Sequence, residues 1–171
     1  FCVFYFLLVR NNYSKIIYPI KSPNLSIQDA INISSTGDTV LISQGIHCCD
    51  NSIIIKPGLV ILGENESNTI FKKISYSNDP IFIIDDAYSI ATIIGHIKFI
   101  GITDEKSKIM DIGIKIGNGS INYRIYNCTF EYFGHAGIYI RGENKGLIDH
   151  CSFKNIFRPE INNFGYGVVV Y

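Results

Sequence analysis

The sequence has no tryptophan, only one methionine, and charged residues that are both few and balanced. Lys plus Arg and Asp plus Glu number 15 each among 171 residues, and together they make up 18%. Coiled coils and helical bundles need a polar face on every helix, so this charge content argues against both. A neutral chain also exerts no long-range field on nucleic acid or on an anionic membrane surface. We therefore expect no nucleic-acid partner.

A long apolar segment and metal-type cysteine spacings are also missing. The apolar run at residues 1–9 falls well short of the roughly 20 residues that cross a bilayer, so no membrane span is predicted. The cysteines are odd in number and form no CxxC pair, which indicates neither a zinc site nor a redox motif. We predict no metal site. The five cysteines are Cys2, Cys48, Cys49, Cys128 and Cys151.

The two ends of the chain suggest a division into a lead-in and one domain. Residues 1–24 form the lead-in, and two interpretations of its apolar start stay open: the tail of a signal peptide, or a buried strand. Residues 25–171 are predicted to form the domain, and we expect the chain to be a piece of a longer protein. Six Asn-x-Ser/Thr triplets fit an exported protein.

The strongest pattern is an internal repeat with a period of about 23 residues. Residues 125–130 (IYNCTF) recur 23 positions later as residues 148–153 (IDHCSF), and residues 94–99 (IGHIKF) are a weaker copy upstream. A Gly-Ile-x-Ile strand precedes each of the first two copies, at residues 113–116 and 137–140. Short strands separated by Gly and Asn turns at this period predict a β-solenoid.

Stacked coils should place equivalent side chains in columns, because parallel strands lie about 4.8 Å apart. We expect Ile125, Cys128 and Phe130 to point into the core. Cys151 then lies over Cys128 at a Cα spacing that suits a disulfide, but parallel side-chain directions keep the two sulfur atoms apart. Buried thiols are therefore predicted.

Two clusters of chemically active residues are interpreted as turns. His96, Asn127 and His150 occupy the same position in successive copies of the repeat, which favours a ladder of turns over a ligand column. His47-Cys48-Cys49-Asp50 at residues 47–50 offer metal ligands in a row, but consecutive residues rarely converge on one ion. A turn at the end of a strand is the preferred interpretation.

The N-terminal edge of such a solenoid needs a cap, and the sequence supplies a helix for it. Ser26 and Asp29 have the spacing of a capping box, and Gly37 is expected to end the helix in a left-handed conformation. The apolar face of the helix is formed by Ile27, Ala30 and Ile31. Strands are then expected at residues 39–43, 52–55 and 59–62.

Three stretches carry a family resemblance: SIQDAI at residues 26–31, TGDTVLI with GI at residues 36–46, and IKPGLVILGEN at residues 55–65. They resemble the opening of right-handed parallel β-helix proteins of the pectin-lyase-like superfamily. The similarity is to its carbohydrate-binding and sugar-hydrolase branch, which includes the periplasmic proteins that mature the copper site of nitrous oxide reductase. The resemblance implies an all-β, right-handed single-stranded parallel β-helix with a short N-terminal capping helix. It fixes no activity, because this superfold hosts many.

In that family, ligands lie along the outer face of one strand column, walled by long loops. Carried over, the resemblance implies that the insertions at residues 101–111 and 158–164 border the ligand. Tyrosines can stack on sugar rings, and lysine and arginine can pair with uronate carboxylates. An ordinary solvated strand face is the alternative. The residues expected on this face are Lys115, Tyr139, Arg141 and Tyr171, with Val169 between the last two.

Catalytic residues stay unknown at this stage. A lyase of this fold would use Arg141 to take a proton, with calcium neutralising the uronate, and only loop acids such as Asp104, Glu105 and Glu160 can supply calcium ligands. A glycosidase needs two carboxylates facing each other, whereas Asp85 and Asp86 (residues 85–86) are adjacent and indicate a turn.

The sequence therefore predicts a secreted or cell-surface β-helix, with the periplasm as an alternative location. We expect a monomer that binds polysaccharide on an outer strand face and needs no cofactor; calcium enters only if the protein is a lyase. Two alternatives stay open. One is the N-terminal part of a polysaccharide lyase or glycoside hydrolase, and the other is a non-catalytic stalk or adhesin.

Overall fold

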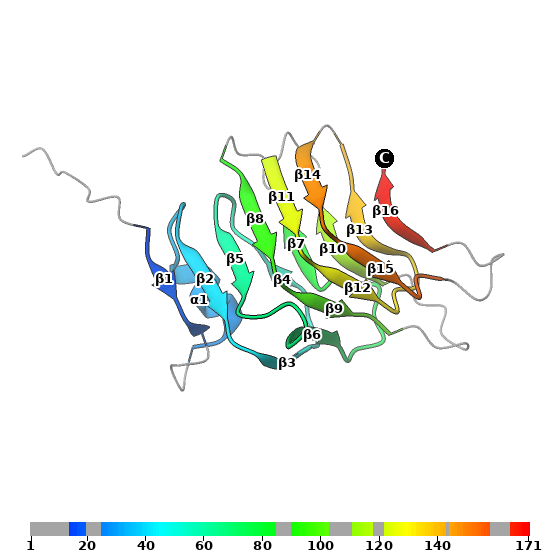
Figure 1. Cartoon of the computed structure of the whole chain (residues 1–171), viewed down its shortest axis with the longest axis horizontal. Helices are drawn as coiled ribbons and strands as arrows, with labels where there is room; N and C mark the ends of the chain where they lie inside the picture. Colours follow the sequence, from blue (N-terminus) through cyan, green and yellow to red (C-terminus); the bar gives the residue numbers. More distant parts are fainter. Residues whose placement is uncertain are drawn as a thin grey trace, which may run out of the picture.

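The protein is a parallel β-helix in which three parallel sheets, A, B and C, wind around a common core (Figure 1). From β2 onward the chain passes through the sheets in the same order five times, so each coil adds one strand to each sheet. This confirms the predicted fold class. The computed structural model describes residues 14–19, 25–84, 90–102, 111–117, 122–142, 144–157 and 165–171.

The strands are short, and all the described pairs between neighbouring coils are parallel. Sheet A contains β1 (Ile16–Ile17), β2 (Thr39–Ile42), β5 (Val60–Gly63), β8 (Thr92–Gly95), β11 (Asn122–Tyr126) and β14 (Lys145–Asp149). Sheet B contains β3 (Gly45–Cys49), β6 (Thr69–Lys73), β9 (Lys98–Ile100), β12 (Thr129–Glu131) and β15 (Ser152–Lys154). Sheet C contains β4 (Ile53–Ile54), β7 (Phe82–Ile84), β10 (Ile112–Ile116), β13 (Ala136–Ile140) and β16 (Tyr166–Val170).

Equivalent residues of the predicted repeat lie opposite each other on neighbouring strands of the sheets. Ile125 lies opposite Ile94 in one neighbouring coil and Ile148 in the other, and Phe130 lies opposite Phe99 and Phe153. Ile125 and Phe130 are fully buried, as is Cys128 between them. The inward pattern expected from the sequence is therefore confirmed.

The core of sheet B is a ladder of stacked rings. Phe71, Phe99, Phe130 and Phe153 follow one another in register, with ring centroids 5.9, 5.0 and 5.2 Å apart. His47 extends the ladder at the N-terminal end, 5.1 Å from Phe71. Such contacts add to the burial of each ring, so this ladder is the aromatic spine of the solenoid.

Helix α1 (Ile27–Ile33) covers the N-terminal end of the core. The predicted capping box is present: the Ser26 hydroxyl accepts from the Asp29 N–H, and the Asp29 carboxylate accepts from the Ser26 N–H. The Gln28 side chain accepts from the Ile54 N–H and donates to the Ile54 carbonyl. Since β4 is an edge strand of sheet C, Gln28 takes the place of a neighbouring strand there.

Gly37 does not end the helix, and that prediction is wrong. The helix stops at Ile33, and the following Ser34 is extended with its hydroxyl bonded to the Ala30 carbonyl. Gly37 lies in the next turn with a φ of 90° and donates to the Gly58 carbonyl. Its left-handed conformation therefore serves the entry into β2. The three strands predicted after the helix appear within one residue of their expected bounds.

The predicted turn ladder is confirmed between sheets A and B. His96, Asn127 and His150 all have left-handed backbones, with φ values of 58°, 47° and 54°. Asparagine tolerates this conformation better than most residues, and histidine is also enriched there. The His96 ring packs edge-on against Tyr126, and the His150 ring contacts the Asp149 carboxylate. The two histidines therefore share a backbone conformation, but their side chains contact different neighbours.

Candidate functional site

The four predicted ligand-binding residues lie on one side of sheet C. Lys115 on β10 is directly opposite Tyr139 on β13. Arg141 follows β13 and donates its N–H to the Ile116 carbonyl, while Tyr171 follows β16 and donates to the Ile140 carbonyl. The ladder of backbone bonds therefore continues past the strand ends. It holds all four residues on three adjacent strands.

The rings on this side form a continuous row. The Tyr139 ring lies 5.7 Å from Tyr171 and 5.6 Å from His135, and His135 lies 6.4 Å from Tyr166. Tyr139 is half-buried, whereas Tyr171 is 73% exposed. We call the group of Lys115, His135, Tyr139, Arg141, Tyr166 and Tyr171 the tyrosine face. The sequence analysis did not identify His135 and Tyr166, because both precede or begin their strands.

Val169 does not belong to the tyrosine face. It lies in register with Tyr139 but is only 8% exposed, so its side chain is not available to a ligand. Val168 and Val170 are instead open, at 37% and 68% exposure. They continue the inward columns of Ile138 and Ile140, and β16 is the last strand of sheet C among the described residues.

A buried carboxylate fixes the turn that carries His135. Asp111 is fully buried, and its side chain accepts from the N–H groups of Gly134 and Ile102. Its own carbonyl accepts from the His135 N–H at 3.1 Å. Burial raises the pKa of Asp111, while these backbone hydrogen bonds oppose the shift. Asp111 is thus a positioning group beneath one end of the tyrosine face.

Several predicted residues lie outside the described part of the chain. Residues 103–110 and 158–164 contain most of both predicted loop walls and the loop acids considered for calcium. The adjacent acids at residues 85–86 also lie outside it. Of the first wall, Gly101, Ile102 and Asp111 are described, and the Asp111 carboxylate bonds to the Ile102 N–H at 2.8 Å.

Residues 47–50 belong mostly to a strand, so the predicted turn is wrong for His47, Cys48 and Cys49. They alternate across β3: the His47 ring stacks on Phe71, Cys48 is exposed and Cys49 is buried. Burial raises the pKa of the Cys49 thiol to about 12. Cys48 points away from His47 and Cys49, so the three side chains cannot converge on one ion. Within the described ranges no group of three or more His, Cys, Asp or Glu side chains can hold a metal.

A buried lysine lines a shallow crevice beside β3. Lys73 is 3% exposed and donates to the carbonyl oxygens of Ser77, at 2.6 Å, and Asp79. Burial lowers the pKa of Lys73, although the negative charges of Asp111 and Asp79 oppose the shift. The ammonium group thereby ties down the loop between β6 and β7.

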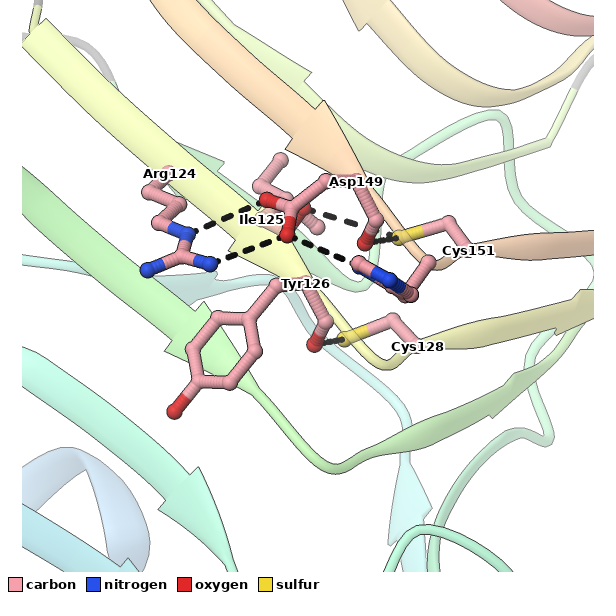
Figure 2. A network of polar contacts seen from close by, with 7 residues as sticks. Arg124, Ile125, Tyr126, Cys128, Asp149 and Cys151 are labelled. Carbon is pink, nitrogen blue, oxygen red and sulfur yellow. Dashed lines mark hydrogen bonds and ion pairs between the residues drawn. The ribbon is translucent and has the colours of Figure 1, made fainter.

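Sheet A carries a charged cluster that the sequence analysis missed (Figure 2). The Arg124 guanidinium binds both oxygens of Asp149 in the next coil, at 3.0 and 2.9 Å, and lies 4.7 Å from the centre of the Tyr126 ring. Hydrogen bonds from Arg124 and then His150 hold the pKa of Asp149 at about 2. The 23-residue offset could have indicated this cluster from the sequence, because it places Tyr126 opposite Asp149.

Two thiols stack beside this cluster. Cys128 and Cys151 are both free, and each donates to the carbonyl two residues earlier in its own coil, at 3.3 Å to Tyr126 and 3.4 Å to Asp149 (Figure 2). The neighbouring Cys151 thiol, together with burial, raises the pKa of Cys128, and the same contact lowers the pKa of Cys151.

Among the described helices, none is long and apolar enough to cross a membrane. Comparison of the chain with protein-family models, with curated proteins and with solved structures finds no match in any of the three.

Proposed function

We propose that this protein is a secreted or cell-surface β-helix that binds polysaccharide along the tyrosine face. The observation that carries the proposal is the row of rings from His135 through Tyr139 to Tyr171, spaced 5.6 and 5.7 Å apart. Lys115 lies opposite Tyr139 in the register, and Arg141 follows two residues after it. Aromatic and cationic side chains thus share a single outer surface.

The chemistry of this surface suits a sugar chain. A pyranose ring presents a face of C–H bonds that stacks on an aromatic ring, and the phenol hydroxyl can bond to sugar hydroxyls. The Arg141 guanidinium matches the geometry of a carboxylate, and Lys115 supplies a compact positive charge. An acidic polysaccharide is therefore the preferred ligand class. Because the side chains stand on a hydrogen-bonded ladder, little backbone order has to be gained on binding.

The finer assignments belong to the same proposal. The stretches at residues 26–31, 36–46 and 55–65 support membership of the pectin-lyase-like superfamily. The six Asn-x-Ser/Thr triplets support export to the cell surface or the periplasm. The protein acts as a monomer and needs no cofactor to bind.

The test is binding to a panel of neutral and acidic polysaccharides, measured by depletion of the protein from solution and by affinity electrophoresis. Tyr139→Ala should weaken binding at least about 10-fold, which corresponds to ~1.4 kcal/mol. Arg141→Gln should weaken the binding of acidic polysaccharides, and it should also reduce the loss of affinity caused by added salt.

Matched controls are available on other surfaces. Tyr76, at 70% exposure in the loop after β6, and Lys154 on β15 are side chains of the same kinds away from the tyrosine face. Tyr76→Ala and Lys154→Gln should bind as the unmodified protein does. Equal losses in these controls, or no depletion with any polysaccharide, would contradict the proposal and favour a stalk. New reducing ends or unsaturated sugars would show an enzyme instead.

A further inference from the structure

Cys128 and Cys151 occupy equivalent places in successive coils. The neighbouring residues Thr129 and Ser152 are paired in the register, and the Ser152 N–H donates to the Cys128 carbonyl at 2.9 Å. Both thiols donate to the carbonyl two residues earlier, so the two side chains leave the backbone in the same direction. Figure 2 shows them one above the other along the stack of coils.

This arrangement does not suit a disulfide. Parallel strands lie about 4.8 Å apart, and side chains with parallel directions keep nearly that separation at their ends. A disulfide needs Cβ atoms about 3.8 Å apart and sulfur atoms about 2.05 Å apart. Cys128 and Cys151 would have to leave their carbonyl partners and turn toward each other to form one.

The spacing does suit a bridging ion, and we propose that Cys128 and Cys151 form a two-thiolate site for a soft, two-coordinate d10 cation of the Cu(I), Ag(I) and Hg(II) class. With metal–sulfur bonds of about 2.3 Å, a linear sulfur–metal–sulfur unit spans about 4.6 Å. Thiolates select such soft ions. Zinc is excluded as the occupant because it needs four ligands, and this site offers two thiols.

The surroundings of the two sulfur atoms favour a cation. Each sulfur atom has a carbonyl partner in its own coil, and the Cys151 sulfur also lies 3.6 Å from the Ile125 carbonyl oxygen. The carboxylate of Glu66 accepts from the Thr129 hydroxyl at 2.9 Å, next to Cys128 in the chain, and Asp149 lies two residues before Cys151, so two negative charges lie near the thiols. The nearby Arg124 is already paired with Asp149.

Loading is a simple exchange of protons for metal. The Cys128 and Cys151 S–H bonds break, two metal–sulfur bonds form, and two protons pass to solvent without any change of oxidation state. Cys128 is fully buried, whereas Cys151 is partly exposed among the described residues, so an ion can reach the pair through the Cys151 thiol.

The test uses Hg(II) as the probe under anaerobic conditions and two matched backgrounds. The first, Cys2→Ser with Cys48→Ser and Cys49→Ala, keeps only the proposed pair. The second, Cys2→Ser with Cys128→Ser and Cys151→Ser, keeps only Cys48 and Cys49, which lie on opposite sides of β3 and cannot share a linear ion. Thiolate-to-mercury absorption and native mass spectrometry report binding and stoichiometry.

The first background should bind one ion per chain, release two protons and gain thermal stability by mass action. Cys151→Ser in that background should weaken binding by more than the roughly 100-fold that loss of an outer-shell partner costs. Three results would each overturn the proposal. They are binding of two ions per chain, undiminished binding in Cys151→Ser, and a mass that is two hydrogens lighter because a disulfide has formed. If Cys128→Ser lowers the circular dichroism signal and so disrupts the fold, the binding measured with Cys151→Ser decides for or against the proposed site, because Cys151 is partly exposed.

Discussion

Single residues in this solenoid are constrained by the coil above and the coil below. Gly113 shows this most clearly. A Cβ atom there would lie 2.5 Å from the carbonyl oxygen of Gly137 and 2.8 Å from the Phe130 ring. The Gly-Ile-x-Ile repeat therefore has a packing cause: the ring of the aromatic spine lies against the glycine. A Cβ on Gly167, by contrast, would meet the partly exposed Phe153 ring no closer than 3.0 Å.

This difference predicts unequal effects of the same substitution. Gly113→Ala should lower the free energy of unfolding by about 1–3 kcal/mol, because the backbone oxygen of Gly137 cannot move aside. Gly167→Ala should cost less than about 1 kcal/mol, since the Phe153 ring can rotate away. Urea unfolding with an unchanged m-value measures both. Equal losses for the two variants would show that Phe130 packing does not require the glycine.

Because Asp149 is charged and paired in the folded chain, we predict that the free energy of unfolding falls at acidic pH. Arg124 and His150 hold the pKa of Asp149 at about 2, below its ordinary value of 3.8. The carboxylate is thus ionised more readily in the folded than in the unfolded chain. Its stabilising contribution is present above pH ~4 and is lost as the pH falls toward 2.

Asp149→Asn tests this directly. The difference in unfolding midpoint between the native chain and Asp149→Asn should be constant above pH ~4 and should shrink between about pH 4 and pH 2. Arg124→Gln serves as the matched control, because removing the guanidinium raises the pKa of Asp149 and should weaken the same acid dependence. A difference that stays constant down to pH 2 would mean that the ion pair does not form in solution.

At the scale of elements, the strands of sheet B depend on the aromatic spine. Phe99 is fully buried, with its ring 5.0 Å from Phe130, 5.9 Å from Phe71 and 5.1 Å edge-on from Phe82. Phe153 has one described ring neighbour within the spine, Phe130. The spine therefore stabilises interior strands more than the outermost one.

Truncation of these two rings should show that gradient. Phe99→Ala should cost about 3–5 kcal/mol, because it removes a fully buried ring and leaves a cavity. Phe153→Ala should cost about 2 kcal/mol or less, since the side chain is already partly open to solvent. Chemical denaturation of the two variants gives the comparison. A larger loss at Phe153 would contradict the predicted ranking.

At the scale of the whole molecule, each coil contacts mainly its neighbours. Helix α1 packs on the first coil, where Gln28 bonds to β4, and the spine residue Phe130 lies three coils further along. Stability in such an array is approximately a sum of coil terms and nearest-neighbour terms. Substitutions should therefore interact only when they lie in the same or adjacent coils.

Double-mutant cycles measure this. Phe99→Leu and Phe130→Leu, whose rings stack at 5.0 Å, should show a coupling energy of about 0.5–3 kcal/mol. Ile31→Val in α1 combined with Phe130→Leu should be additive within about 0.5 kcal/mol. Strong coupling between Ile31 and Phe130 would contradict the nearest-neighbour description of stability.

The periodic and the local features of the fold could be predicted from the amino-acid sequence. The 23-residue offset predicted the pairing of Ile125 with Ile148, and the Ser26–Asp29 spacing predicted the capping box, because both depend on residues close together or regularly spaced. The two Gly-Ile-x-Ile strands, 24 residues apart, brought Lys115 and Tyr139 to one outer face, since this pattern fixes which positions point out. Their role in binding polysaccharide stays a prediction.

The contacts between coils of unequal length could not be predicted before the register of the strands was known. Val60 lies 21 residues after its partner Thr39 but 33 residues before its partner Ile93, so no single period aligns all the strands. The bond from Gln28 to β4 and the ion pair of Arg124 with Asp149 depend on that register. When a side chain contacts the next coil, the lengths of the intervening turns determine which residue it meets. No local sequence pattern encodes those lengths.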